Sequence, residues 1–272
     1  MVFKLHVISG LPRSGSTLLA ALLRQNPRFA AGMTSPVASL CSALHQRMGP
    51  TAEFSVFYTE RKRRALLRSV LDAYYEDVPA DHVVFDTNRS WTSKMAWLAE
   101  LYPDCRVICC VREVGWIIDS IERMMNKNPL HLSRIFDAKT EGSVYSRVEI
   151  LMNSERGLIG SPWSMLREAW FGDFAQRLII VPYESLCRNP AAVMNRLYAE
   201  LKEEPFAHDF DNVVYDEPDY DADLGMPGMH TVQPKVEYRQ REPGIPPDLF
   251  AKYADTAFWA RPDLNRRGVK IL

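Results

Sequence analysis

The sequence has almost no net charge, no long apolar run and few cysteines. Its 33 lysines and arginines face 34 acidic residues, for a formal net charge of −1. No overall field therefore attracts nucleic acid or an anionic membrane, and any anion must be bound locally. No apolar stretch approaches the roughly 18–20 residues that a membrane-spanning helix requires. We expect neither nucleic acid nor a membrane among its partners.

The five cysteines form no disulfide or metal-binding pattern. Their number is odd, no C-x-x-C occurs, and no cysteine or histidine spacing suits zinc. Cys109 and Cys110 are neighbours in an apolar run, and neighbours on a strand point to opposite faces. The first residues, "MVFKLHVISG", also lack the charged and apolar regions of a secretory signal. These features predict reduced thiols, no metal site and a cytoplasmic location.

Apolar runs of strand length alternate with helical patterns over the first 200 or so residues. Nearly continuous apolar strands separated by helices are typical of a parallel sheet that is covered on both faces. The 272 residues therefore predict a single α/β domain with three layers and a P-loop-type central sheet, followed by a loop-rich C-terminal cover over about 205–272. The predicted strands are 3–9, 82–87, 105–111 and 177–183.

Capping residues and apolar periodicity mark the helices. Ser35 precedes Pro36, and Asn189 precedes Pro190, an order typical of the first residues of a helix. The "RKRR" run in the longest predicted helix is interpreted as a solvated face. The predicted helices begin near 16, 36, 59, 93, 114 and 190, and a helical middle region covers about 130–174.

The stretch "GLPRSGST" directly follows the first predicted strand. Gly10, Gly15 and Thr17 fit the Walker A pattern, but Ser16 stands where that pattern has lysine. A glycine loop between strand and helix aims backbone N–H groups and the positive helix end at one point. Arg13 adds a planar cation that can grip two oxygens. The predicted phosphate-binding residues are Pro12, Arg13, Ser14, Gly15, Ser16 and Thr17.

A second anion-binding pattern lies in "CVREVGWIIDSIER". Arg112 stands at the carboxyl end of the third predicted strand, and Ser120 lies eight positions further on, in the following helix. Ligands of open α/β sheets bind at that strand edge. The spacing alone is weak, but it gains specificity when it is combined with the N-terminal loop.

The loop resembles the 5′-phosphosulfate loop of sulfotransferases, in the P-R-S-G-[ST]-T form of tyrosylprotein sulfotransferase-like and bacterial members. The resemblance implies 3′-phosphoadenosine-5′-phosphosulfate (PAPS) as donor and adenosine 3′,5′-bisphosphate (PAP) as product. It also implies that Arg112 and Ser120 hold the 3′-phosphate. "IIVPYESL" and "GMHTVQPKV" resemble two further family segments, which implies that Tyr183, Thr231 and Lys235 lie near the nucleotide.

The implied reaction is sulfuryl transfer to an alcohol or phenol hydroxyl, carried by a small molecule, a glycan or a peptide. A transferring sulfuryl group carries less negative charge than a γ-phosphoryl group. Fixed hydrogen-bond donors can therefore replace the metal ion and the Walker lysine.

The family's catalytic bases are not matched. Where tyrosylprotein sulfotransferases have Gly-Glu-Glu, "AAGMTSPV" supplies Met33 and Thr34. Where the cytosolic enzymes have Lys-Thr-His, "FDTNRSW" has neither lysine nor histidine. The resemblance therefore does not identify the catalytic base of this chain.

Asp86, at the carboxyl end of the second predicted strand, is the first candidate for the base. Arg89 could then supply the charge of the missing family lysine. Asp86 as a structural cap for "TNRSW" is an equal alternative, and His45 and His230 are further candidates.

Two rival functions stay open. In a P-loop kinase, "HVVFD" would be a Walker B strand with Asp86 holding magnesium, although the lost lysine speaks against it. A non-catalytic nucleotide sensor would explain the missing base. The segment 209–223 contains seven acids, which form either a solvated loop or the border of an acceptor site.

Overall fold

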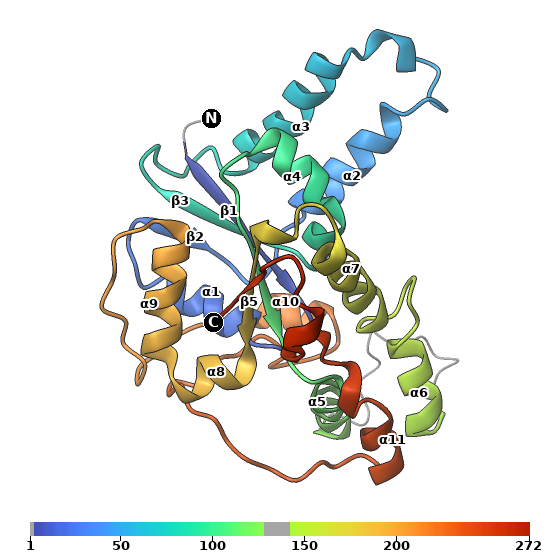
Figure 1. The fold of residues 1–272 in the computed structure, drawn as a ribbon, viewed down its shortest axis with the longest axis vertical. Helices are drawn as coiled ribbons and strands as arrows, with labels where there is room; N and C mark the ends of the chain where they lie inside the picture. Colours follow the sequence, from blue (N-terminus) through green and yellow to red (C-terminus); the bar gives the residue numbers. More distant parts are fainter. Residues whose placement is uncertain (1–2, 128–141) are drawn as a thin grey trace.

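A six-stranded sheet forms the centre of the protein (Figure 1). The computed structural model describes residues 3–127 and 142–272. The strand order is β2-β3-β1-β4-β5-β6, and every neighbouring pair is parallel. The strands are β1 (Lys4–Gly10), β2 (Phe29–Ala31), β3 (Val83–Thr87), β4 (Val107–Val111), β5 (Leu178–Pro182) and β6 (Lys270–Ile271). The α/β fold class is confirmed.

The four strands expected from apolar runs are present, whereas β2 and β6 are not predicted by the sequence. Both are edge strands, of three and two residues. Such short segments carry no detectable periodicity, and they pair only because the chain passes beside a strand that is already formed.

Helices cover both faces of the sheet (Figure 1). They are α1 (Ser16–Leu23), α2 (Val37–Arg47), α3 (Glu60–Tyr74), α4 (Met95–Leu101), α5 (Val114–Lys127), α6 (Val144–Leu151), α7 (Gly160–Phe171), α8 (Tyr183–Arg188), α9 (Pro190–Leu201), α10 (Pro218–Asp223) and α11 (Pro247–Lys252).

The predicted helix starts are confirmed to within about two residues, including the one near 93. There a 3-10 segment, Arg89–Lys94, precedes α4. Ser35 Oγ accepts a hydrogen bond from the Val37 amide at 3.2 Å, and Asn189 caps α9 through the Ala192 amide at 3.4 Å. Part of the predicted middle region, 128–141, lies outside the described residues.

Side chains of successive strand residues enter two separate cores. Cys109 packs with α2, α3, α5 and α7 on one face, and Cys110 packs with α1 and α9 on the other. All five cysteines are buried, which agrees with their interpretation as core residues. Within the described parts of the chain, no helix has the length and apolarity needed to cross a membrane.

The C-terminal cover, residues 205–272, returns across the carboxyl edge of the sheet before it ends in β6. The Met33 amide, just after β2, donates to the hydroxyl of Tyr215 at 2.8 Å and so ties the cover to the body of the domain. Apart from β6, the described structure of the cover consists of short helices and irregular segments.

The position of β1 between β3 and β4 brings the candidate residues together. The connection after β1 leads to β2 on one side of the sheet, and the connection after its neighbour β4 leads to β5 on the other side. In open parallel sheets a crevice forms between two such strands, beyond their carboxyl ends. The glycine loop follows β1, Arg89 follows β3, Arg112 follows β4 and Tyr183 follows β5.

The close approach of β1 and β4 at this edge requires glycine at position 10. Gly10 has a φ of +105°, and a Cβ there would collide with the backbone carbonyl of Cys110. We expect Gly10→Ala to lower the free energy of unfolding by at least about 3 kcal/mol, as left-handed strain and a backbone clash add. Urea unfolding monitored by fluorescence measures the change.

Gly268→Ala is the matched control. Gly268 also has a positive φ, +66°, but a Cβ there meets no atom within 4 Å. The control should lose only about 1–2 kcal/mol. Equal losses in the two variants would show that the β1–β4 contact tolerates a side chain.

Candidate active site

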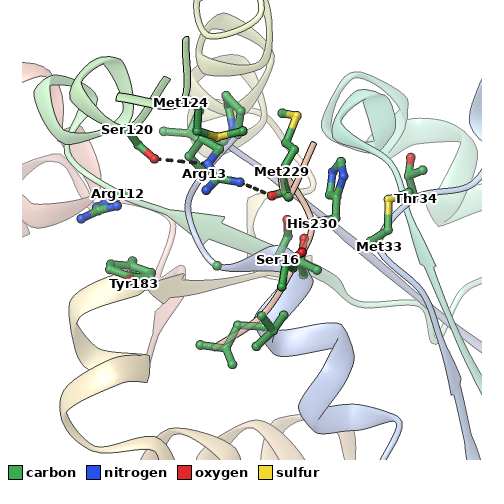
Figure 2. A pocket seen from close by; sticks show the side chains of 18 of the residues that line it. Arg13, Ser16, Met33, Thr34, Arg112, Ser120, Met124, Tyr183, Met229 and His230 are labelled. Atoms are coloured by element: carbon green, nitrogen blue, oxygen red, sulfur yellow. Dashed lines mark hydrogen bonds between the residues drawn. The ribbon is translucent and has the colours of Figure 1, made fainter. Parts of the chain in front are cut away.

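A cavity of about 1050 Å³ lies at the carboxyl edge of the sheet. Its wall comes from the glycine loop, the segments after β2 and β3, Arg112 after β4, the second half of α5, the end of α6 with residues 156–158, α8 and the C-terminal cover. In Figure 2, Arg112 and Tyr183 lie to one side of Arg13, and Met33, Thr34 and His230 lie to the other. The volume slightly exceeds the range typical of small-molecule sites, so a nucleotide and a second small molecule can share it.

The glycine loop presents the N-terminus of α1 to this cavity. Gly15, with a φ of +89°, precedes α1, and no side chain caps that helix or places an acid in its first turn. Arg13 also has a left-handed backbone, with φ +55°. The first amides of α1 are thus free of side-chain acceptors, which is the condition for binding an anion.

Ser14 differs from its neighbours in the loop. Its side chain is buried, and its hydroxyl donates to the carbonyl of Pro12 at 3.1 Å. Pro12, Arg13, Gly15, Ser16 and Thr17 line the cavity, but Ser14 does not. Ser14 therefore shapes the loop with its side chain and can offer only its amide to a ligand.

Arg13 reaches the residues that follow β4. Its Nε donates to Ser120 Oγ at 3.2 Å, and its Nη1 donates to the carbonyl of Met229. Burial, and next the charge of Arg112, lowers the pKa of Arg13. The structure thus brings Ser120 into contact with the glycine loop. The charges of Arg13 and Arg112 together are complementary to a bound anion.

The guanidinium of Arg112 contacts Tyr183 and Glu184, but not all of its N–H groups have hydrogen-bond partners among the described residues. Its guanidinium carbon lies 4.2 Å from the ring centroid of Tyr183, and its Nε lies 3.8 Å from Glu184 Oε1. Among the described residues, this buried Nε has no hydrogen-bond partner. Burial raises the pKa of Tyr183 to about 12, so its phenol stays protonated at neutral pH. A buried donor left unpaired is costly, and a ligand atom would relieve that cost.

The cover supplies further polar groups. Thr231 Oγ1 donates to Asp216 Oδ1 at 2.8 Å, and Lys235 Nζ lies 3.3 Å from Asp211 Oδ1. Both residues line the cavity. Part of the acidic segment 209–223 thus pairs with neighbouring residues of the cover.

Two arginines of the cavity wall are not predicted from the sequence. Arg239 and Arg241 line the wall, and Arg241 Nη2 lies 2.7 Å from Asp119 Oδ2. Asp119 is fully buried and also accepts from the Gly244 amide at 2.6 Å. These arginines lie in an irregular segment, and only the alternation in "YRQRE" marks them.

Arg89 faces the cavity from the segment after β3. In the described residues, its side chain makes no hydrogen bond and no ion pair, and the residue is exposed at the open side of the cavity. Such a guanidinium is available to a bound anionic group.

Asp86 lies outside the cavity wall. It is fully buried and accepts hydrogen bonds from Ser35 Oγ (2.5 Å), Tyr75 Oη (2.7 Å) and Trp91 Nε1 (2.5 Å). Burial raises its pKa, and these donors oppose the shift. This geometry favours the structural interpretation of Asp86 over the catalytic one. It also gives the kinase hypothesis no Walker B carboxylate at the cavity.

The two candidate histidines differ in position. The His45 ring is tilted against the Trp97 ring, with ring centroids 4.5 Å apart. His45 does not line the cavity, whereas His230 does. Buried Asp221 lies 2.5 Å from the His230 ring nitrogen Nδ1. Over residues 3–127 and 142–272, no cluster of three or more His, Cys, Asp or Glu side chains could hold a metal ion.

Comparisons with known proteins agree on one family. The sequence model of the "Sulfotransferase family" matches residues 7–207. The structure of a sulfotransferase from Alicyclobacillus acidocaldarius shares 16% identity and a TM-score of 0.50, over 82% of this chain and 89% of that chain. The sulfotransferase domain of the Synechococcus PCC 7002 olefin synthase shares 18% identity and a TM-score of 0.49, over 93% of each chain. At these identities the likeness concerns the fold alone. No curated protein matches the chain.

The burial of Asp86 predicts a loss of stability when its carboxylate is removed. Asp86→Ala leaves the three donors from Ser35, Tyr75 and Trp91 unpaired in the core, and we expect a loss of about 3 kcal/mol or more. Chemical denaturation measures the loss. Asp81→Ala, at an exposed carboxylate just before β3, should leave the denaturation midpoint unchanged. An unchanged midpoint for Asp86→Ala would contradict the structural role.

Proposed function

This chain belongs to the sulfotransferase family, and we propose that it uses PAPS as donor and the hydroxyl of an alcohol or phenol as acceptor. The acceptor hydroxyl belongs to a small molecule, a glycan or a peptide. Adenosine 3′,5′-bisphosphate is the product released from the donor. We propose a cytoplasmic location, on the strength of the reduced, buried cysteines.

The observation that carries this proposal is the presence of the glycine loop, Arg112 and Ser120 on one cavity wall, together with a buried Arg112 Nε that has no hydrogen-bond partner among the described residues. A nucleotide with phosphates on both its 3′ and 5′ positions needs two anion sites. We assign one to the loop amides at the α1 N-terminus and the other to Arg112 with Ser120. A nucleotide without a 3′-phosphate would leave the Arg112 Nε without a hydrogen-bond partner.

In this proposal each element of the wall binds one part of the donor. The amides of 14–17 and the hydroxyls of Ser16 and Thr17 hold the 5′-phosphosulfate. Arg112, oriented by its stacking on Tyr183, binds the 3′-phosphate with Ser120. Arg13 lies between the two sites, because it extends from the loop to Ser120. Thr231 and Lys235 border the nucleotide from the cover.

PAPS, when bound, supplies the sulfuryl group and an oxygen leaving group on its 5′-phosphate. The loop amides and Arg13 stabilise the charge that develops on that leaving oxygen, because they are fixed before the reaction begins. Arg89, unpaired and open to the cavity, stabilises the negative oxygens of the sulfuryl group during transfer.

The predicted test of the 3′-phosphate site compares two nucleotides. Arg112→Ala should weaken binding of adenosine 3′,5′-bisphosphate about 10- to 100-fold, the effect of one charge-assisted contact, and should leave binding of 5′-AMP nearly unchanged. Isothermal titration calorimetry measures both affinities without a reaction. Ser120→Ala should reproduce the same selectivity with a smaller loss.

Arg188→Ala is the matched control, because Arg188 also stacks on a tyrosine, Tyr238, at 3.9 Å but does not line the cavity. Its affinities should equal those of wild type. Equal losses for the two nucleotides in Arg112→Ala would refute the 3′-phosphate assignment. Stabilisation by ATP with magnesium, and none by the bisphosphate, would favour the kinase. Bisphosphate binding without transfer of labelled sulfate would favour the sensor.

Arg89 should act on the rate and not on donor binding. Arg89→Met removes the charge but keeps most of the apolar stem, and we expect kcat to fall at least about tenfold with an unchanged dissociation constant for adenosine 3′,5′-bisphosphate. Lys94→Met, seven residues after the end of β3 and not on the cavity wall, serves as control. A parallel loss of nucleotide affinity in Arg89→Met would place Arg89 in the donor site instead.

A further inference from the structure

The peptide group between Met229 and His230 is held from both of its ends. Its carbonyl oxygen accepts a hydrogen bond from Arg13 Nη1, and its N–H donates to Asp221 Oδ2 at 2.8 Å. One contact comes from the glycine loop and the other from α10. The backbone at His230 is therefore fixed relative to the phosphate-binding loop, although it belongs to an irregular segment.

The ring of His230 is fixed as well. Its Nδ1 lies 2.5 Å from Asp221 Oδ1, and Tyr220 packs edge-on against the ring with centroids 5.5 Å apart. Asp221 is fully buried, whereas the His230 side chain is 16% exposed. Donation to a carboxylate oxygen requires the proton on Nδ1, and in that tautomer Nε2 has a free lone pair. Since Nδ1 faces the buried carboxylate, Nε2 is the ring edge nearer the cavity.

Few other groups on this wall can accept a proton. In the described part of the chain, His230 is the only histidine that lines the cavity, and Glu237 is the only carboxylate. Glu237 accepts a hydrogen bond from Arg239 Nε at 2.5 Å, so one of its oxygens already has a partner. Cys187 is held as a thiol, because burial raises its pKa.

His230 also lies on the side of the cavity where the family base is missing. Figure 2 shows His230 on the same side of Arg13 as Met33 and Thr34, the residues that replace the Gly-Glu-Glu carboxylate. Arg112 and Tyr183 are on the opposite side. The histidine thus faces the part of the cavity that the proposed nucleotide leaves to the acceptor.

We propose that His230 is the general base of the transfer reaction and that Asp221 is its positioning residue, a role that rests on the proposed function. Nε2 of His230 takes the proton of the acceptor hydroxyl as the acceptor oxygen bonds to sulfur. The bond between sulfur and the leaving oxygen breaks, and its electron pair stays on the 5′-phosphate. Asp221 stabilises the resulting imidazolium, which later releases its proton to solvent.

The kinetic test separates the rate from binding. His230→Gln should lower kcat at least about a hundredfold, the usual effect of losing a general base, while calorimetric affinity for adenosine 3′,5′-bisphosphate stays unchanged. Asp221→Asn should lower kcat at least about tenfold, because an amide cannot balance the imidazolium charge. His45→Gln, at the histidine outside the cavity, is the matched control and should keep wild-type kcat.

Two further measurements distinguish a base from a structural residue. Added imidazole should restore part of the activity of His230→Ala, which a folding defect would not allow. In the ligand-free protein, ¹⁵N NMR of labelled histidine should show His230 as the Nδ1–H tautomer in wild type. Thermal melts of each variant check that the fold is retained.

The outcomes bear separately on the two proposals. Wild-type kcat in His230→Gln, or an Nε2–H tautomer in the free protein, would overturn the role of His230 and leave the proposed function standing. No transfer of labelled sulfate from PAPS by the wild-type protein, with any alcohol or phenol, would overturn the proposed function and this role with it.

Discussion

Two fully buried carboxylates hold together the cationic cavity on which the rest of the site depends. Asp119 accepts from Arg123 and from the Gly244 amide and pairs with Arg241, and Asp221 binds the backbone and ring of His230. Arg13 and Arg112 repel one another, and burial of Arg13 removes part of the solvent that would screen this repulsion. The carboxylates of Asp119 and Asp221 offset part of this repulsion from behind the wall. The Arg112 Nε on the wall has no hydrogen-bond partner among the described residues and can donate to an added anion.

The same two carboxylates attach the C-terminal cover to the domain. Asp119 lies on α5, next to Ser120, and binds the cover at Arg241 and Gly244. Asp221 belongs to the cover itself, and its hydrogen bonds to the His230 amide and ring fix the irregular segment that carries His230. Arg13 then joins that segment to the glycine loop through the Met229 carbonyl. Any displacement of the cover therefore changes both the nucleotide wall and the acceptor wall.

Sequence reasoning reached the parts of this site that depend on local pattern. The four long strands, the glycine loop and the Arg112–Ser120 spacing are short-range features, and each follows from residues within about a dozen positions of one another. Arg241, the contact of Arg13 with Ser120 and the short strand β6 depend on the path of a cover that has little periodicity. Asp86 and Asp221 show the limit most clearly. Both are aspartates near aromatic residues and both are fully buried, but only the fold places Asp86 among donors of the core and Asp221 behind a histidine on the cavity wall.

This chain has Met33 where tyrosylprotein sulfotransferases have a glutamate base, and its "FDTNRSW" segment lacks the lysine of the cytosolic enzymes. With His230 as the base, the electrostatics of proton removal differ from those of a carboxylate base. A carboxylate base is negative before the transfer and neutral after it, whereas an imidazole base is neutral before and positive after. A new cation beside Arg13 and Arg89 would be unfavourable without a counterion, and Asp221 is that counterion, already desolvated and in contact with the ring. The positive charge appears on His230 as negative charge appears on the leaving oxygen held by the loop. The two charges attract one another, so an imidazole base in this cavity stabilises the product side of the reaction as a carboxylate cannot.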